Sequence, residues 1–130
     1  MTRFLVDTSA YSAFLNGHPG VQGALREADE IAVTPVVLGE LQAGFLKGSR
    51  QQSNLDILRR FLESARVKIV ELDEETAAYY AAILDSLRKQ GTPIPTNDVW
   101  IAASAMQHGL RVLTCDRHFL NIAQIMTNYH

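Results

Sequence analysis

The sequence predicts an α/β fold: a three-layer sandwich in which helices cover both faces of a parallel sheet of four to five strands. Two observations support this prediction. Short β-branched or apolar runs alternate along the chain with longer stretches whose apolar residues recur at helical spacing. Such alternation implies crossover connections, which give parallel strands. The length of 130 residues and the absence of a linker-like stretch predict one domain over residues 1–130.

The first half of the chain is divided by Gly and Pro residues into short elements. The expected strands are residues 3–6, 30–34 and 67–72. The expected helices are residues 8–16, 21–28, 36–46 and 55–65. Gly17-His18-Pro19-Gly20 separates the first two helices. Pro35 suits the first turn of the third helix, because the N–H that proline lacks has no partner there.

The second half begins with a long expected helix from Asp73 to Lys89, whose acidic first turn and basic last turn complement the helix dipole. After a Pro-rich loop, Thr96 or Asn97 is expected to cap a helix that starts at Asp98 and runs to His108. The remaining expected elements are a strand over residues 110–113, a short helix over 117–121 and an edge strand over 123–127.

Composition places limits on the class of protein. The formal net charge is −2 and the isoelectric point is about 6.0, so the strong basic signal of many nucleic-acid binders is missing. A local basic face or a bound cation still attracts phosphate. A single cysteine, Cys115, allows no intrachain disulfide. Without a signal peptide or a long apolar span, we expect a soluble cytoplasmic protein with no membrane association.

Four acidic residues stand where an α/β fold places its ligands. Asp7 and Asp116 each follow an expected strand, and parallel strands bring both to the carboxyl edge of the sheet. Asp98 begins an expected helix, and Glu40 lies within an apolar one. Converging carboxylates repel each other, and burial makes an isolated one costly. A divalent cation relieves both costs, and oxygen ligands suit Mg²⁺ or Mn²⁺.

Each of these acids also has an ordinary structural explanation. Asp7 and Asp116 each precede an expected helix and are suited to cap it. Asp98 complements the dipole at a helix N-terminus, and Glu40 is placed to pair with a lysine or arginine, such as Lys47, on a solvated side. That all four are incidental together is the weaker explanation.

The stretches around these acids resemble the four signature stretches of the PIN-domain nucleases, and within that family the chain is similar to the VapC-type toxins of bacterial toxin–antitoxin pairs. The stretches read FLVDTSAY, TPVVLGEL, PTNDVWIAA and VLTCDRHF. The resemblance covers nearly the whole chain. It implies a PIN-like fold and an acidic site made of Asp7, Glu40, Asp98 and Asp116.

The resemblance also implies the chemistry, which is metal-dependent hydrolysis of phosphodiester bonds in single-stranded RNA by an endoribonuclease. The implied cofactor is Mg²⁺, with Mn²⁺ as the alternative; such a cation acidifies bound water and neutralises charge that develops at phosphorus. Asp7, Asp98 and Asp116 are the implied metal ligands. Glu40 is implied either as a further ligand or as the residue that orients the attacking water.

Smaller polar residues of the family's site have matches here as well, and we expect them to hold a carboxylate or a metal-bound water. They are Thr8, Ser9, Asn97 and Thr114. Some family members carry a further acid just beyond the last one, where this chain has Arg117 and His118. A second metal is therefore left open, and His118 is not expected to take part in catalysis.

The expected contacts with other molecules rest on fewer residues. Candidate phosphate contacts are Lys47, Arg50 and Arg117, which are equally explained as ordinary surface cations. The resemblance implies a homodimer and a small antitoxin that lays a peptide into a groove beside the site. Apolar residues within 11–15 and 41–46 are suited to line such a groove or to fill the core. Trp100 is interpreted as core or dimer interface rather than as a base-stacking platform.

Other functions stay open at this point. A stand-alone RNA-processing PIN nuclease, or a PIN-like module that binds RNA or a partner without cleaving, shares the same features. A phosphoacceptor receiver domain is disfavoured, because it needs paired acids after the first strand and a lysine after the last core strand. Here Asp7 is followed by Thr8, and Thr114-Cys115-Asp116 contains no lysine.

Overall fold

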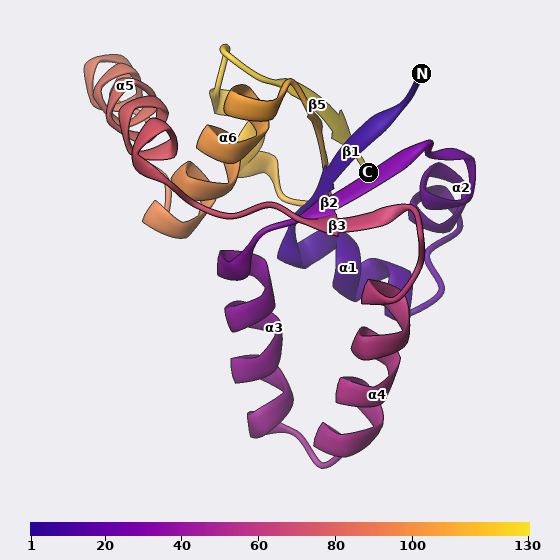
Figure 1. The fold of residues 1–130 in the computed structure, drawn as a ribbon. Coiled ribbons are helices and arrows are strands. Elements are labelled where there is room, and N and C mark those ends of the chain that lie inside the picture. Colours follow the sequence, from indigo (N-terminus) through magenta and orange to yellow (C-terminus); the bar gives the residue numbers. More distant parts are fainter.

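The computed structural model describes residues 1–130 and contains a five-stranded sheet with the order β3-β2-β1-β4-β5 (Figure 1). Every neighbouring pair of strands is parallel. The strands are β1 (Arg3–Val6), β2 (Glu30–Val33), β3 (Val67–Ile69), β4 (Arg111–Thr114) and β5 (Met126–Tyr129). The predicted parallel α/β architecture is therefore confirmed, and β1 lies at the centre of the sheet.

Six α-helices and one 3₁₀ helix connect the strands. They are α1 (Thr8–Leu15), α2 (Pro19–Glu27), α3 (Pro35–Lys47), α4 (Gln51–Leu62), α5 (Glu74–Gln90), α6 (Thr96–His108) and η1 (Arg117–Asn121). Figure 1 shows α5 and α6 together on one side of the sheet, with α1 and α2 on the other. The pair α3 and α4 packs as a hairpin that projects from the sheet. None of these helices combines the length and the apolar character that crossing a bilayer requires.

The core is built where the central strands meet α6. Leu5 and Val6 of β1 and Leu113 of β4 are fully buried, as expected for a strand covered on both faces. Ala102 and Ala103 of α6 are fully buried too, and their small side chains let this helix approach the sheet closely. This packing fixes the ends of β1 and β4, which carry the acidic residues.

Several boundaries differ from the predictions; the strand expected over 67–72, for example, ends at Ile69. The helix α4 begins at Gln51 instead of residue 55, because its first turn is exposed and shows no apolar periodicity. The edge strand β5 spans Met126–Tyr129 instead of 123–127; its mixed burial leaves no alternating pattern, and residues 123–125 form a turn. The helix α6 begins at Thr96 with Pro95 as N-cap residue and no side-chain cap, so the predicted cap by Thr96 or Asn97 is wrong.

Candidate active site

Asp7 lies at the junction of β1 and α1 and is almost completely buried, at 3% exposure. Its Oδ1 accepts a hydrogen bond from the backbone N–H of Ala10 at 2.8 Å, so it caps α1. Thr114 Oγ1 donates to Asp7 Oδ2 at 2.6 Å, and Ser9 Oγ lies 2.9 Å from both carboxylate oxygens. The capping explanation is thus correct, and it leaves Asp7 rigidly oriented.

The charge on Asp7 is nevertheless unfavourable. Burial raises the pKa of Asp7 to about 6, although hydrogen bonds from Thr114, Ala10 and Ser9 favour the ionised form. The negative charge of Asp98 raises this pKa further. A helix cap alone does not require such a buried carboxylate, because an exposed one caps equally well. A cation at this point would offset the cost.

Glu40 is held by α3, whose start is fixed by Pro35 and by the cap bond from the Val37 N–H to Thr34 Oγ1. Thr8 Oγ1 donates to Glu40 Oε1 at 2.6 Å, and Asn97 Nδ2 donates to Glu40 Oε2 at 3.4 Å. These contacts connect α1, α3 and α6 through one carboxylate. The structure shows no ion pair between Glu40 and Lys47, so that structural alternative is wrong.

Asp98 and Asp116 approach each other from α6 and from the loop after β4. His118 Nδ1 lies 3.0 Å from Asp98 Oδ2 and 3.1 Å from Asp116 Oδ1. The backbone N–H of His118 also donates to Asp116 Oδ1 at 2.9 Å, which caps η1 as expected. Sequence reasoning did not assign His118 to the site. The signal available was its spacing two residues after Asp116, which a 3₁₀ turn folds back onto the acid.

The four acids lie close enough for the charge of one to affect the pKa of another. Burial raises the pKa of Asp98, and the charges of Asp116 and Glu40 raise it further, while His118 opposes the shift. Asp98 in turn raises the pKa of Asp7. The predicted convergence of Asp7, Glu40, Asp98 and Asp116 is thus present in the structure. The catalytic or metal-binding role of each residue stays a prediction.

Hydroxyl groups fix the shared end of β1 and β4. Beyond its bond to Asp7, Thr114 Oγ1 accepts from the Asp116 N–H at 2.8 Å. Ser9 Oγ accepts from the Cys115 N–H at 2.9 Å and lies 3.3 Å from Thr114 Oγ1. Burial and the charge of Asp7 raise the pKa of the Cys115 thiol, which favours a structural role for it. Thr114 and Ser9 thus position both a carboxylate and the loop that carries Asp116.

The predicted RNA-contacting cations make no contact with the acids. Lys47, Arg50 and Arg117 are all exposed. The first two flank the turn between α3 and α4, at the far end of that hairpin from the sheet (Figure 1). Arg117 directly follows Asp116. Trp100 is half-buried and stacks on Tyr80 with ring centroids 4.1 Å apart, in line with a packing role.

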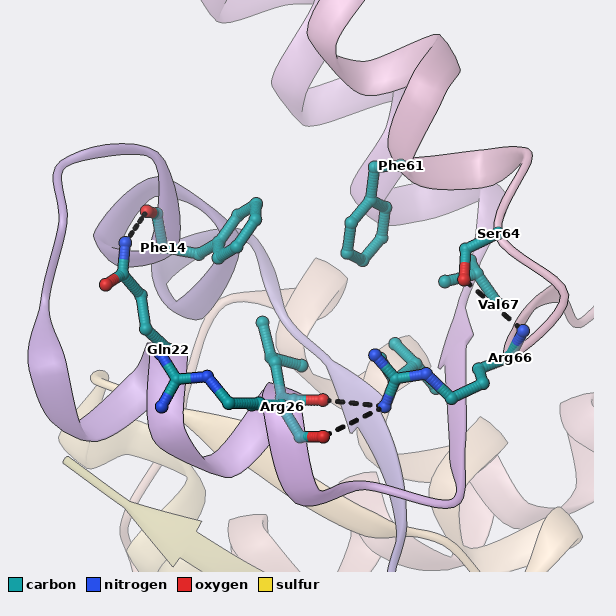
Figure 2. A pocket seen from close by; sticks show the side chains of 9 residues that line it. Phe14, Gln22, Arg26, Phe61, Ser64, Arg66 and Val67 are labelled. Atoms are coloured by element: carbon teal, nitrogen blue, oxygen red, sulfur yellow. Dashed lines mark hydrogen bonds between the residues drawn. The ribbon is translucent and has the colours of Figure 1, made fainter.

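A separate apolar hollow of about 390 Å³ lies between α1, α2, α4 and β3 (Figure 2). Its apolar lining is Phe14, Leu25, Ile31, Phe61 and Val67. Arg66 lies at its rim and donates through Nη1 to the carbonyl oxygens of Leu25 and Arg26, which Figure 2 shows, and to that of Ala28. Of the residues expected to line a groove, only Phe14 lines this one. Tyr11, Leu41 and Phe45 are buried in the core instead.

The comparisons with known proteins agree with the fold. A sequence profile of the PIN domain matches residues 4–125. The chain belongs to the PIN domain family. Ribonuclease VapC4 of Mycobacterium tuberculosis is 30% identical over 122 residues, which cover 90% of this chain and 88% of that protein.

Solved structures agree as well. DNA-bound VapBC from Salmonella typhimurium superposes with a TM-score of 0.85 at 25% identity and covers 98% of each chain. VapBC-5 from Mycobacterium tuberculosis, a member of the VapBC family of toxin–antitoxin systems, gives a TM-score of 0.79 at 24% identity over 100% of each chain. These matches confirm the predicted PIN-like sandwich and the family resemblance.

Proposed function

We propose that residues 1–130 form one catalytic domain, a divalent-metal-dependent endoribonuclease that serves as the toxin of a toxin–antitoxin pair. The observation that supports this most is the coupled group of Asp7, Glu40, Asp98 and Asp116 at the carboxyl ends of the central strands. Membership of the PIN domain family and likeness to a VapC ribonuclease point to the same activity.

The residues present fit a divalent cation. Asp7 is a buried carboxylate whose ionised form is disfavoured, and Asp98 is a partly buried carboxylate whose pKa is also raised. Carboxylate oxygens are hard ligands, which suit Mg²⁺ and also Mn²⁺. Asp7, Asp98 and Asp116 would hold the cation, with Glu40 as a further ligand or beside it. When bound, the cation would supply an acidified water and neutralise charge on the scissile phosphate.

The chain's own residues carry out the positioning. Thr8 and Asn97 donate hydrogen bonds to the Glu40 carboxylate, which in this proposal orients the attacking water if it does not itself bind the cation. Thr114, Ser9 and the start of α1 keep Asp7 in one orientation, so little reorganisation accompanies the reaction. Asp116 is held by η1 and by the Thr114 hydroxyl through the backbone.

RNA is the proposed substrate. Arg117, next to Asp116, is the first candidate for a phosphate contact, and the exposed Lys47 and Arg50 at the α3–α4 turn are proposed as further phosphate contacts away from the acids. Lys and Arg side chains contact phosphate groups of RNA, and binding that depends on such contacts weakens as the salt concentration rises. Arg117→Ala is expected to raise KM in low salt, with a smaller effect in high salt.

The proposed partners are a small antitoxin protein and a second copy of this chain, with the complex in the cytoplasm. The apolar hollow lined by Phe14 and Phe61 offers an anchoring site for one apolar side chain of the antitoxin. Its rim of Gln22, Arg26 and Arg66 offers polar contacts around that anchor. Co-expression of this chain with the reading frame next to its gene, followed by co-purification, tests the partnership.

Cleavage of total cellular RNA by the purified chain tests the activity. The reactions contain Mg²⁺, Mn²⁺ or a chelator, and the chain is compared with Asp7→Asn and with Asp85→Asn. Asp85 is an exposed acid on α5, so its substitution is a matched control for the loss of one charge. We expect discrete fragments that need metal, vanish with Asp7→Asn and persist with Asp85→Asn. Identical behaviour of all three proteins in every metal would favour a module that binds without cleaving.

A further inference from the structure

His118 occupies an unusual position between two carboxylates of the candidate site. Its Nδ1 is 3.0 Å from Asp98 Oδ2 and 3.1 Å from Asp116 Oδ1. Ligand atoms of these three residues all lie within 4.8 Å of one another. The other histidines, His18, His108 and His130, do not belong to this cluster.

A single proton on His118 Nδ1 cannot make a good hydrogen bond to both carboxylates. Nδ1 carries at most one hydrogen, which would have to be shared between two carboxylate oxygens, and an unprotonated Nδ1 would face both oxygens with its lone pair. Three electron-rich atoms around one point are satisfied better by a multivalent cation. The contacts of His118 Nδ1 with the two carboxylates therefore fit three ligands around one metal ion at least as well as they fit hydrogen bonds.

The spacing also suits a cation. In an octahedral site with bonds of about 2.1 Å, neighbouring ligand atoms lie about 3.0 Å apart. The two distances from His118 Nδ1 match that edge. The His118 side chain as a whole is 46% exposed, so a cation can reach it from solvent.

The protein holds His118 in this place. Its backbone N–H donates to Asp116 Oδ1, and the next residue, Phe119, is fully buried in the core. The 3₁₀ turn is thus fixed by Asp116 before His118 in the sequence and by Phe119 after it.

We propose that His118 is a nitrogen ligand of the metal centre and biases that centre toward Mn²⁺ over Mg²⁺. Mg²⁺ strongly prefers oxygen ligands and keeps its waters, whereas imidazole is a good ligand for transition metals. The inference rests on the proposed metal site, and it assigns a role to the residue found where some relatives carry a further acid.

Pulsed electron paramagnetic resonance of Mn²⁺ bound to the purified chain detects the ligand directly. Wild type is expected to show electron spin echo modulation from one directly bound ¹⁴N, which changes to the ¹⁵N pattern when the histidines are labelled. The signal is lost in His118→Gln and kept in His130→Gln, a matched control at an exposed histidine. Circular dichroism melting verifies that each variant is folded.

This experiment distinguishes failure of the His118 proposal from failure of the proposed metal site. Mn²⁺ that binds without nitrogen modulation, or modulation that persists in His118→Gln, would overturn the role of His118 and leave the metal site intact. No Mn²⁺ binding by any of the proteins would overturn the metal site itself, and the inference with it.

Competition between Mg²⁺ and Mn²⁺, followed by the free Mn²⁺ signal, tests the selectivity. We expect His118→Gln to lower the ratio of Mn²⁺ affinity to Mg²⁺ affinity about tenfold. His118→Asp is expected to lower the same ratio while Mg²⁺ binds at least as tightly as in wild type, because it restores an all-oxygen set. A ratio within twofold of wild type in both variants would overturn the proposal.

Discussion

The candidate site has a buried half and an open half, and the two are held in different ways. Asp7 is 3% exposed and receives hydrogen bonds from Thr114, Ser9 and the start of α1. The side chains of Asp98 and Asp116 are 14% and 34% exposed, and their shared close neighbour is His118. The buried half is fixed before any ligand arrives, whereas the open half gives solvent, cation and RNA access.

Because of this difference in exposure, ionising a carboxylate costs more free energy in the buried half than in the open half. In the buried half, an ionised carboxylate is kept away from water and its pKa is raised to about 6. In the open half, the carboxylates of Asp98 and Asp116 are partly solvated and contact His118, so their negative charges cost less. We therefore expect substitutions of Asp7 to change both activity and stability, and substitutions in the open half to change mainly activity.

The largest expected effect is on the reaction. Asp7→Asn keeps an acceptor for the Ala10 N–H but removes the charge, so RNA cleavage is expected to fall about a thousandfold. Initial rates on a defined single-stranded RNA in Mg²⁺ and in Mn²⁺ measure this, with Asp85→Asn as control. A loss below about tenfold would mean that the buried carboxylate is a helix cap and little more.

The pH dependence of stability is the second expected effect. The pKa of Asp7 is about 6 in the folded chain against about 3.8 when unfolded, so the folded state binds the proton more tightly. The resulting stabilisation is full below pH 4 and is lost as the pH rises through 6. In chelator, wild type is expected to lose about 2–3 kcal/mol relative to Asp7→Asn over that range.

Urea unfolding of both proteins at several pH values measures that difference. A constant difference between wild type and Asp7→Asn from pH 4 to pH 7 would show that burial does not perturb Asp7. The opposite slope, with wild type gaining stability as the pH rises, would show that the hydrogen bonds outweigh burial.

Thr114→Val tests the contacts of the buried half without removing charge. Thr114 is fully buried, donates to Asp7 and accepts from the Asp116 N–H. Leaving these groups unpaired is expected to cost about 1–3 kcal/mol of unfolding free energy and to slow cleavage about tenfold. Thr127→Val, on the edge strand β5, is the matched control and is expected to stay within about 0.5 kcal/mol of wild type. Equal effects of both substitutions would contradict the assignment.

The smallest expected effects concern Glu40. Its bond from Thr8 is 2.6 Å long, whereas that from the exposed Asn97 is 3.4 Å long. Thr8→Val is therefore expected to lower kcat about fivefold to tenfold, and Asn97→Ala about twofold, with KM nearly unchanged in both. A rise in KM with an unchanged kcat would indicate that these residues bind RNA instead of orienting Glu40.

Much of this arrangement was predictable from the sequence, since strand ends in a parallel sheet share one edge and Asp7 and Asp116 each follow a strand. Glu40 was identified because a carboxylate inside an apolar helix is unusual. The short helix over 117–121 was expected, but the contacts of His118 with Asp98 and Asp116 were missed, because they depend on how this turn packs beside α6, which the sequence does not show. The start of α4 and the position of β5 were misjudged since exposed turns and edge strands lack a regular apolar pattern. The apolar hollow depends on packing between four distant segments, which spacing does not reveal.

The unfolding free energy of wild type and Asp7→Asn at pH 7, with Mg²⁺ or Mn²⁺ and with chelator, tests the central claim that the buried carboxylate is placed to hold a metal. In chelator we expect Asp7→Asn to be the more stable protein, because it buries no charge. With saturating metal we expect the order to reverse, since only wild type gains the full binding energy. Wild type more stable by the same amount in both conditions would contradict the claim and leave Asp7 as a helix cap.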